Sequence, residues 1–346
     1  MTAAGRLAAA TIMPDHQMAD VIASLARQVM SGTPLSRGQA ELLADLDNEH
    51  LLDLFRWAGR LREHFVGPQV RCCSIVAAKA GRCPEDCAFC SQSAHYATSC
   101  QGLTHRQPDE VFDAAMEAAA NGAECFGIVN SGYGPTDEEI EHWGPTITRI
   151  RQSGRIQVCA SLGVLTQEQA RRLGELGLRH YNHNLQTSRQ HFGRIVTTHT
   201  YDDRLRTLLC LKEAGVSLCS GALFGMGETW ADRLDLAFEL RGLDPDVVPI
   251  NFLIPIAGTP LETAVPLEPM LCLKIIAVYR FILPRQQIRI AGGREVNLRD
   301  LQSWIFLAGA DSFLIGNYLT TCGRAAQEDH RMVRDLGLAM RSEHAT

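Results

Sequence analysis

The sequence predicts a (β/α)8 barrel of the TIM type that follows a helical N-terminal extension. The first 65 residues show helical periodicity, whereas strand-like and helix-like blocks alternate through the rest of the 346-residue chain. The alternation gives eight strand–helix units, the number that closes such a barrel. A doubly wound open sheet fits less well, because no Gly-x-Gly-x-x-Gly sequence follows an early strand. We therefore expect residues 1–65 to form the extension and residues 66–346 to form one barrel domain.

The individual elements follow from local patterns of apolar residues and helix-ending glycines. The helices of the extension are expected at residues 18–30, 35–46 and 49–64. The eight strands are expected at residues 72–79, 124–130, 156–162, 179–185, 216–223, 247–254, 287–291 and 311–316. The remaining helices are expected at residues 109–121, 138–152, 167–176, 201–214, 230–241, 268–283, 297–308 and 325–338. Helix ends are marked by Gly122, Gly154, Gly177 and Gly215.

Composition excludes several classes of protein. The net charge is −6 and no basic block stands out, so a nucleic-acid platform is not expected. No apolar run reaches 18 residues, and residues 1–10 lack the pattern of a secretory signal. Twelve cysteines without an export signal indicate thiolate chemistry in a reducing cytoplasm. Ordinary structural roles are expected for four of them, namely Cys100, Cys210, Cys272 and Cys322.

Polar side chains occur on successive expected strands, where a barrel normally buries aliphatic residues. A single buried Asn or Cys is usually structural, but a series on four strands indicates an interior built around a ligand. The residues in question are Cys159, Asn182, Asn184, Cys219 and Asn251.

The strongest local signal is a Cys-x3-Cys-x2-Cys sequence directly after the first expected strand. It comprises Cys83, Cys87 and Cys90, three thiolates that can hold one corner of an iron–sulfur cluster. A structural zinc site normally has four ligands, and His95 is the nearest candidate for a fourth. Three ligands on a four-iron cluster would leave one iron open to a small molecule.

This pattern, with aromatic Phe89 before the last cysteine, resembles the radical S-adenosylmethionine superfamily. The resemblance implies that the open iron binds the amino and carboxylate groups of S-adenosylmethionine. It also implies that an electron from the reduced cluster cleaves this cofactor to methionine and a 5′-deoxyadenosyl radical.

The rest of the chain, from about Leu51 onward, resembles the biotin synthase family. The resemblance lies in residues 83–87 with 91–93, Tyr-Asn-His-Asn-Leu at 181–185, residues 219–221 with 225–229, and residues 248–251, 258–260 and 293–295. It implies a homodimeric enzyme that abstracts hydrogen from dethiobiotin and inserts sulfur from an auxiliary iron–sulfur cluster. A flavodoxin- or ferredoxin-type reductant and cluster-assembly proteins are the implied partners.

The resemblance also implies roles for individual residues. Cys83, Cys87 and Cys90 would hold the four-iron cluster. The S-adenosylmethionine site would include Phe89, Asn184, Gln186, Arg204, Gly225, Gly227 and Glu228. Dethiobiotin would contact Lys79, Asn182, Asn184 and Asn251. The auxiliary cluster would be bound by Cys159, Cys219 and Arg294.

The chain departs from the family pattern at two positions. Gly127 stands where the commoner form has a further cluster cysteine. Cys73, which faces inward by the two-residue period from Lys79, is the first candidate for a replacement, and Cys125 is the second. The auxiliary cluster can thus be of the two-iron type or a larger variant. Gln186 stands where an acidic residue that meets the cofactor ribose is common.

Three other functions remain open at this point. A sister radical enzyme, such as a hydrogenase-cofactor maturase or methylornithine synthase, would share the barrel and the first cluster. It would not be expected to carry Asn182, Asn184, Asn251 and Arg294 together. An electron-transfer iron–sulfur protein would not need the long barrel, and a zinc-stabilised binding protein would contain zinc without sulfide.

Overall fold

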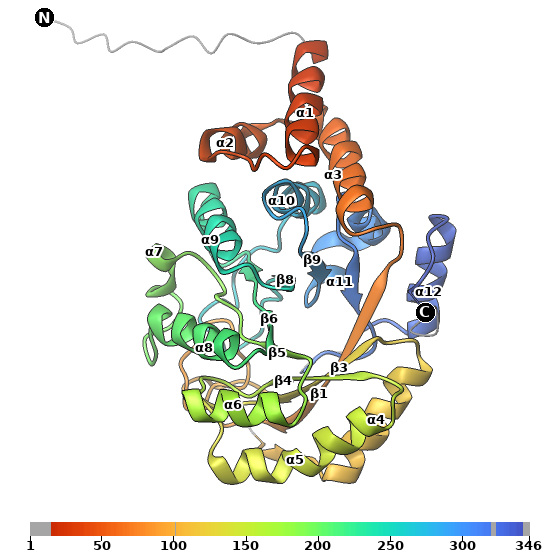
Figure 1. Ribbon diagram of the computed structural model, residues 1–346. Helices are drawn as coiled ribbons and strands as arrows, with labels where there is room; N and C mark the ends of the chain where they lie inside the picture. The colour runs from red at the N-terminus through yellow and green to blue at the C-terminus, as the bar shows by residue number, and fades with distance from the viewer. Residues whose placement is uncertain (1–14, 101, 320–322, 342–346) are drawn as a thin grey trace, which may run out of the picture.

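The computed structural model describes residues 15–100, 102–319 and 323–341, and it confirms a closed parallel barrel (Figure 1). Closure comes from the last strand, which pairs in parallel with the first. The barrel strands are β1 (Arg71–Ala80), β3 (Cys125–Asn130), β4 (Gln157–Ser161), β5 (His180–Asn182), β6 (Ser217–Cys219) with its continuation β7 (Ala222–Phe224), β8 (Val247–Phe252), β9 (Gln287–Ile290) and β10 (Ser312–Leu314). A short strand that was not predicted, β2 (Thr104–His105), pairs antiparallel with the end of β1. The residues before position 15 and Cys322 lie outside the described residues.

Helices surround the strands, and among the described residues three α-helices and one 3-10 helix precede the first strand. The early helices are α1 (Asp15–Met30), α2 (Arg37–Asp45), the 3-10 helix η1 (Asn48–His50) and α3 (Leu51–Phe65). The later ones are α4 (Pro108–Ala120), α5 (Asp137–Gln152), α6 (Gln167–Glu175), α7 (Arg189–Phe192), α8 (Tyr201–Glu213), α9 (Trp230–Leu243), α10 (Pro269–Ile282), α11 (Arg294–Leu298), the 3-10 helix η2 (Arg299–Ile305) and α12 (Ala326–Asp335). No helix among the described residues is long and apolar enough to cross a membrane.

Local sequence explains where the barrel helices begin and end. Four consecutive long helices, α5, α6, α8 and α9, start with a threonine whose side chain accepts from the backbone three residues later, in a reciprocal capping box. Gly122 and Gly215 follow α4 and α8 with φ of +82° and +70°, a left-handed conformation that favours glycine. The predicted helix ends are confirmed at these positions.

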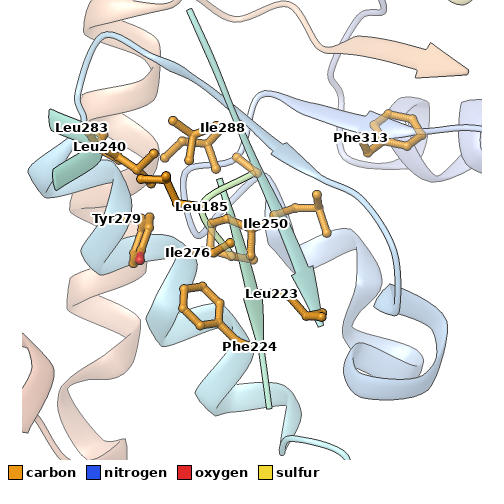
Figure 2. Packing of buried hydrophobic residues seen from close by; sticks show 14 of the residues in the cluster. Leu185, Leu223, Phe224, Leu240, Ile250, Ile276, Tyr279, Leu283, Ile288 and Phe313 are labelled. Carbon is orange, nitrogen blue, oxygen red and sulfur yellow. The ribbon is translucent and has the colours of Figure 1, made fainter. Parts of the chain in front are cut away.

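The main apolar core lies between the strands and the helices. Helix α10 is buried on all sides from Cys272 to Ile282, because α2 and α3 pack against its outer face. Figure 2 shows Tyr279 of this helix near Phe224 of β7, and their ring centroids lie 5.5 Å apart. The early helices thus complete the shell of the barrel on one side, as Figure 1 shows above α10.

Two elements differ from the prediction. The fifth barrel strand is interrupted between β6 and β7 at Gly221, where a Cβ atom would lie 1.9 Å from the Pro249 carbonyl oxygen. The helix expected at residues 297–308 is instead the short α11 followed by η2. Arg299 joins them with a positive φ of 50°, which an α-helix cannot accommodate. The one-turn helix α7 was not predicted.

Candidate active site

The loop after β1 brings Cys83, Cys87 and Cys90 to the carboxyl end of the barrel. The backbone folds back on itself, since the Cys83 amide donates to the Gln92 carbonyl at 2.8 Å and the Cys90 amide donates to the Cys87 carbonyl at 2.9 Å. Gly81 begins the loop with φ of +82°, and a Cβ atom there would lie 2.2 Å from a backbone oxygen. The three thiols are therefore held by a rigid local fold rather than by their own contacts.

The spacing of these thiols suits a cluster better than a single ion. Among the described residues, the only three metal-ligating side chains with all ligand atoms within 4.8 Å are Asp47, Glu49 and His50, which lie elsewhere. Four ligands around one zinc ion would lie closer together than that. His95, the candidate fourth zinc ligand, bonds the Pro84 carbonyl oxygen at 2.8 Å instead. The donor set thus fits a polynuclear iron–sulfur cluster.

Burial keeps these cysteines protonated unless a metal is present. Desolvation raises the pKa of Cys87 to about 12 and that of Cys90 to about 11. It also raises the pKa of Cys83, against two backbone hydrogen bonds. Bound iron would supply the positive charge that favours the thiolates.

Arg204 lies beside this loop and is held by a buried chain of hydrogen bonds. Its Nε donates to His199 Nε2 at 3.1 Å, and its Nη1 donates to the Asn184 carbonyl at 2.7 Å. His199 Nδ1 in turn lies 2.5 Å from Glu85 Oε2. Because Arg204 requires an acceptor, His199 is neutral and donates its Nδ1 proton to Glu85. Burial lowers the pKa of Arg204, and a nearby Cys87 thiolate would raise it in part.

The Gly-Met-Gly-Glu segment forms a tight loop, and the carboxylate of Glu228 stabilises that loop. Gly225 and Gly227 have φ of +99° and +86°. The Glu228 carboxylate accepts from the Gly225 and Met226 amides, and it pairs with Arg233 at 2.8 Å. Glu228 therefore has its oxygen atoms engaged, and it positions the loop rather than presenting a free carboxylate to a ligand.

A cavity of about 270 Å³ occupies the barrel interior below these loops. Its lining includes every polar residue singled out on the strands, namely Cys159, Asn182, Asn184, Cys219 and Asn251. The Asn182 Nδ2 atom donates to Asn184 Oδ1 at 3.1 Å and to Cys219 Sγ at 3.3 Å. Asn251 uses one donor on the Ala222 carbonyl and one acceptor site on the Gly292 amide. Each amide retains hydrogen-bonding capacity toward a ligand.

Gln186 also lines this cavity, in a backbone conformation that is unusual for its type. Its φ is +72°, and its amide and carbonyl groups bond to Gly221 and Leu223. A non-glycine residue in this region carries strain that the surrounding fold must support. The strained backbone points the amide side chain toward the cavity.

Three cysteines, Cys73, Cys159 and Cys219, line the same cavity, and a fourth, Cys125, packs against Cys73 and Cys159. Cys73 of β1 is the register partner of Cys125 of β3, and both are almost fully buried. Hydrogen bonds from Cys159 and then from Cys73 lower the pKa of Cys125 well below its usual value. Cys219 completes the group, with its pKa raised by burial and lowered in part by Arg289. Cys72 points to the outer core instead, as predicted, and contacts the Gly122 carbonyl.

Arg289 of β9 is the arginine that faces these thiols, and the sequence analysis missed it. Its Nη2 lies 3.5 Å from Cys125 Sγ, and its pKa is raised by all four cysteines against the effect of burial. A signal was available in the strand pattern. Ile288 and Ile290 pack outward, so the two-residue period turns Arg289 inward.

The position of Arg294 does not support the ligand role that was predicted for it. Arg294 lies beyond the end of β9, does not line the cavity, and pairs with Asp329 at 2.6 Å. Its guanidinium is committed to this buried ion pair. Lys79 likewise does not line the cavity, because its ammonium pairs with Glu139 at 2.6 Å. The structure therefore brings neither side chain to the cavity.

Two solved structures show that the fold is shared with other proteins. The chain matches methylornithine synthase with a TM-score of 0.81 over 92% of this chain and 97% of that chain, at 18% identity. It matches the FeFe-hydrogenase maturase HydG from Carboxydothermus hydrogenoformans with a TM-score of 0.78 over 94% of this chain and 80% of that chain, at 19% identity. At identities this low, the similarity shows that the fold is shared and carries no information about the reaction.

Sequence comparison gives the class first and then the family. Residues 79–240 match the Radical SAM superfamily, and residues 249–339 match the Biotin and Thiamin Synthesis associated domain. With the three-cysteine loop on a closed barrel, these matches define a radical S-adenosylmethionine enzyme, a class that uses a four-iron cluster and S-adenosylmethionine. The chain is 47% identical to a biotin synthase of Geotalea daltonii over 92% of its length and 97% of that protein. It is 48% identical to a biotin synthase of Trichlorobacter lovleyi over 93% of its length and 97% of that protein. The chain belongs to the biotin synthase family, so the sister enzymes are not favoured.

Proposed function

We propose that this chain converts dethiobiotin to biotin, with sulfur drawn from a second iron–sulfur cluster in the four-cysteine pocket. The observation that carries the proposal is the arrangement of one interior cavity between two sets of thiols. Along β1, Cys73 lies near the start and Cys83 lies just beyond the end. At about 3.3 Å per residue, the strand between them spans roughly 20 Å. A substrate bound between the two ends of this strand could face both sets of thiols.

Cys83, Cys87 and Cys90 would hold the first cluster, and Arg204 would bind the cofactor carboxylate. When bound, this cluster would supply the electron for reductive cleavage of S-adenosylmethionine. The chain's own part is to orient the cofactor, through Arg204 and the Gly225–Gly227 turn, and to keep water away. Replacement of any of the three cysteines by alanine should abolish production of 5′-deoxyadenosine. Retained production in one of these variants would contradict the assignment.

Asn182, Asn184 and Asn251 would hold the ureido ring of dethiobiotin. A cyclic urea offers donors and acceptors together, and a side-chain amide matches both. Leaving a buried polar group unpaired costs about 1–3 kcal/mol, so Asn251→Ala should weaken dethiobiotin binding about tenfold. Unchanged affinity would contradict this role.

Cys73, Cys125, Cys159 and Cys219 would bind the auxiliary cluster, with Arg289 beside it. The support is the convergence of four thiols on one arginine where Gly127 offers no ligand. Four thiols can hold a four-iron cluster, whereas the two-iron form with an arginine ligand would need only three of them. In this proposal both Cys73 and Cys125 contribute, rather than one replacing the other.

Iron analysis tests the auxiliary site directly. Cys73→Ser and Cys125→Ser should each lower iron and sulfide per chain and abolish biotin formation, while cofactor cleavage by the first cluster persists. Cys72→Ser is the matched control, because the thiol of Cys72 is next in sequence to that of Cys73 but faces the outer core. Full iron content in both inward variants would refute the four-cysteine site.

The remaining expectations belong to the same proposal. We expect a cytoplasmic homodimer that receives electrons from a flavodoxin- or ferredoxin-type reductant and iron and sulfide from cluster-assembly proteins. We also keep the division of the chain at residues 65 and 66. Its support is that α3 ends at Phe65 and the first strand starts at Arg71. Size-exclusion chromatography with light scattering would test the dimer.

A further inference from the structure

The barrel is also hollow at its opposite end, where the strands begin. A second cavity of about 500 Å³ lies there and is lined by the first residues of several strands. Cys125 opens β3, Gln157 opens β4, His180 opens β5 and Gln287 opens β9. This cavity, called here the lower cavity, is separate from the substrate cavity described above.

Only a thin wall of side chains separates the two cavities. His180 and Arg289 line both of them. Cys125 lines the lower cavity and packs in one buried cluster with Cys73 and Cys159, which line the upper cavity. The four-cysteine pocket can therefore be reached from below by the movement of very few side chains.

The lower cavity carries an excess of positive charge. Its lining has five arginines, Arg71, Arg179, Arg285, Arg289 and Arg341, against three carboxylates, Glu124, Asp244 and Asp246. Glu124 is shared by two of the arginines, at 3.9 Å from Arg71 and 3.2 Å from Arg341. Among the described residues, no carboxylate lies within 4.0 Å of the guanidinium groups of the other three. A lining of this kind attracts small anions and repels metal cations.

A buried donor in the same lining also lacks a partner. Gln287 is 7% exposed, and its Nε2 atom has no hydrogen-bond partner among the described residues. Buried amide groups are normally paired, so an unpaired donor at a cavity wall indicates a ligand or solvent that completes it. Arg289 lies two residues further along the same strand and supplies further donors on the same side.

We propose that the lower cavity is an entry site for hydrosulfide, which reaches the four-cysteine pocket from the amino end of the barrel. The proposal rests on the proposed function, because a cluster that gives up sulfur must be resupplied. The anion fits the charge of the lining, and Gln287 and Arg289 offer it donors. Entry from below also leaves the substrate cavity and the three-cysteine loop undisturbed, since both lie toward the other end.

The first test measures access to Cys125 in the full-length protein before iron loading. A negatively charged reagent, sulfonatoethyl methanethiosulfonate, is compared with neutral methyl methanethiosulfonate, and labelling of Cys125 is followed by peptide mass spectrometry. In the double variant Arg179→Glu/Arg285→Glu, the anionic rate should fall about three- to tenfold while the neutral rate stays unchanged. High salt should reduce the difference, because it screens exposed charges. An anionic rate equal to that of the parent would overturn the proposal.

Arg331→Glu/Arg334→Glu is the matched control. Arg331 and Arg334 are exposed arginines of α12 outside both cavities, so the same change in charge should leave both rates as they are. If the control slows the anionic reagent as much as the double variant does, the effect is one of overall charge and the entry site is refuted.

The second test follows cluster formation with inorganic sulfide as the probe. Gln157→Trp places a large side chain at the exposed mouth of the lower cavity. Iron uptake by the first cluster should be normal in this variant, which also shows that it is folded, whereas the auxiliary absorbance should grow several-fold more slowly. Equal growth rates in parent and variant would overturn the entry site but leave the proposed function intact. Failure of the parent to form any second cluster would instead refute the proposed function.

Discussion

Replacing His199 by leucine should weaken the binding of S-adenosylmethionine without removing the first cluster. His199 contacts none of the three loop cysteines in the hydrogen-bond network, yet it accepts from Arg204 Nε at 3.1 Å and contacts Glu85 at 2.5 Å. Leucine fills a similar space but can neither accept a hydrogen bond from Arg204 nor donate one to Glu85. Arg204 would then lose the partner that fixes its guanidinium plane, and Glu85 would keep the Thr198 hydroxyl at 2.6 Å.

The size of the effect follows from burial. All three members of the chain are less than 10% exposed, so water cannot readily replace the lost partner. An unsatisfied buried donor costs about 1–3 kcal/mol, which corresponds to roughly 5- to 150-fold in a dissociation constant. We therefore expect the dissociation constant of S-adenosylmethionine to rise by about tenfold or more. His199→Gln should restore much of the affinity, because an amide can accept from Arg204 and donate to Glu85.

The assay is anaerobic equilibrium binding with cluster-loaded protein, and iron content is measured on each sample. Arg206→Leu is the control. Arg206 lies on α8, the helix that carries Arg204, and its guanidinium pairs with Asp203 at the surface. Its replacement should therefore change the dissociation constant by less than twofold. The reasoning would be refuted by His199→Leu protein with full iron content and parental affinity. Lowering the pH should also raise the dissociation constant of S-adenosylmethionine. Burial and Arg204 lower the pKa of His199, and protonation below the usual imidazole range would place a second N–H against Arg204.

Three further predictions concern the fold that supports the site. Gly221→Ala places a methyl group where the Pro249 carbonyl oxygen lies, so we expect a loss of about 1–3 kcal/mol or more and a lower melting temperature. Arg280→Met leaves the Asp311 carboxylate buried without its partner at 2.6 Å, and urea unfolding should show a loss of about 3–5 kcal/mol; a loss below 1 kcal/mol would contradict this. Burial lowers the pKa of His183, so the unfolded chain binds its proton first and the free energy of unfolding should fall as pH drops below about 6.5. His183→Gln should make that slope shallower, as measured by urea unfolding at pH 7 and pH 5.

Much of the fold was predictable because its signals are local. The two-residue period placed Cys73 inward and Cys72 outward, and the structure confirms both. The break in the fifth strand was not predictable, since it depends on contact between Gly221 and the next strand. The prediction of one helix at residues 297–308 was also wrong, because the apolar pattern does not reveal the positive φ of Arg299 that interrupts it.

The site was predictable where motif and strand period agreed. Five polar residues on four strands were expected to share one interior, and all five line one cavity. Arg289 follows the same two-residue period, but it was not predicted to face inward because a charged side chain is not expected inside an apolar barrel. Arg294 was favoured only through resemblance, and its buried pair with Asp329 removes it from the thiols.

Strand β1 links the two ends of the proposed chemistry in one continuous segment. Its side chains alternate, so a shift of one residue would turn Cys73 to the outer core and Cys72 to the cavity. Its register with β3 sets Cys73 opposite Cys125, and the register of β3 with β4 sets Gly127 opposite Cys159. A thiol at Gly127 would meet Ile75 on the neighbouring strand, whose Cγ2 lies 3.1 Å from the Cβ position there. This tight packing favours the proposal that the cysteines one rung closer to the amino end take the ligand role, which would bring the auxiliary cluster nearer to the lower cavity.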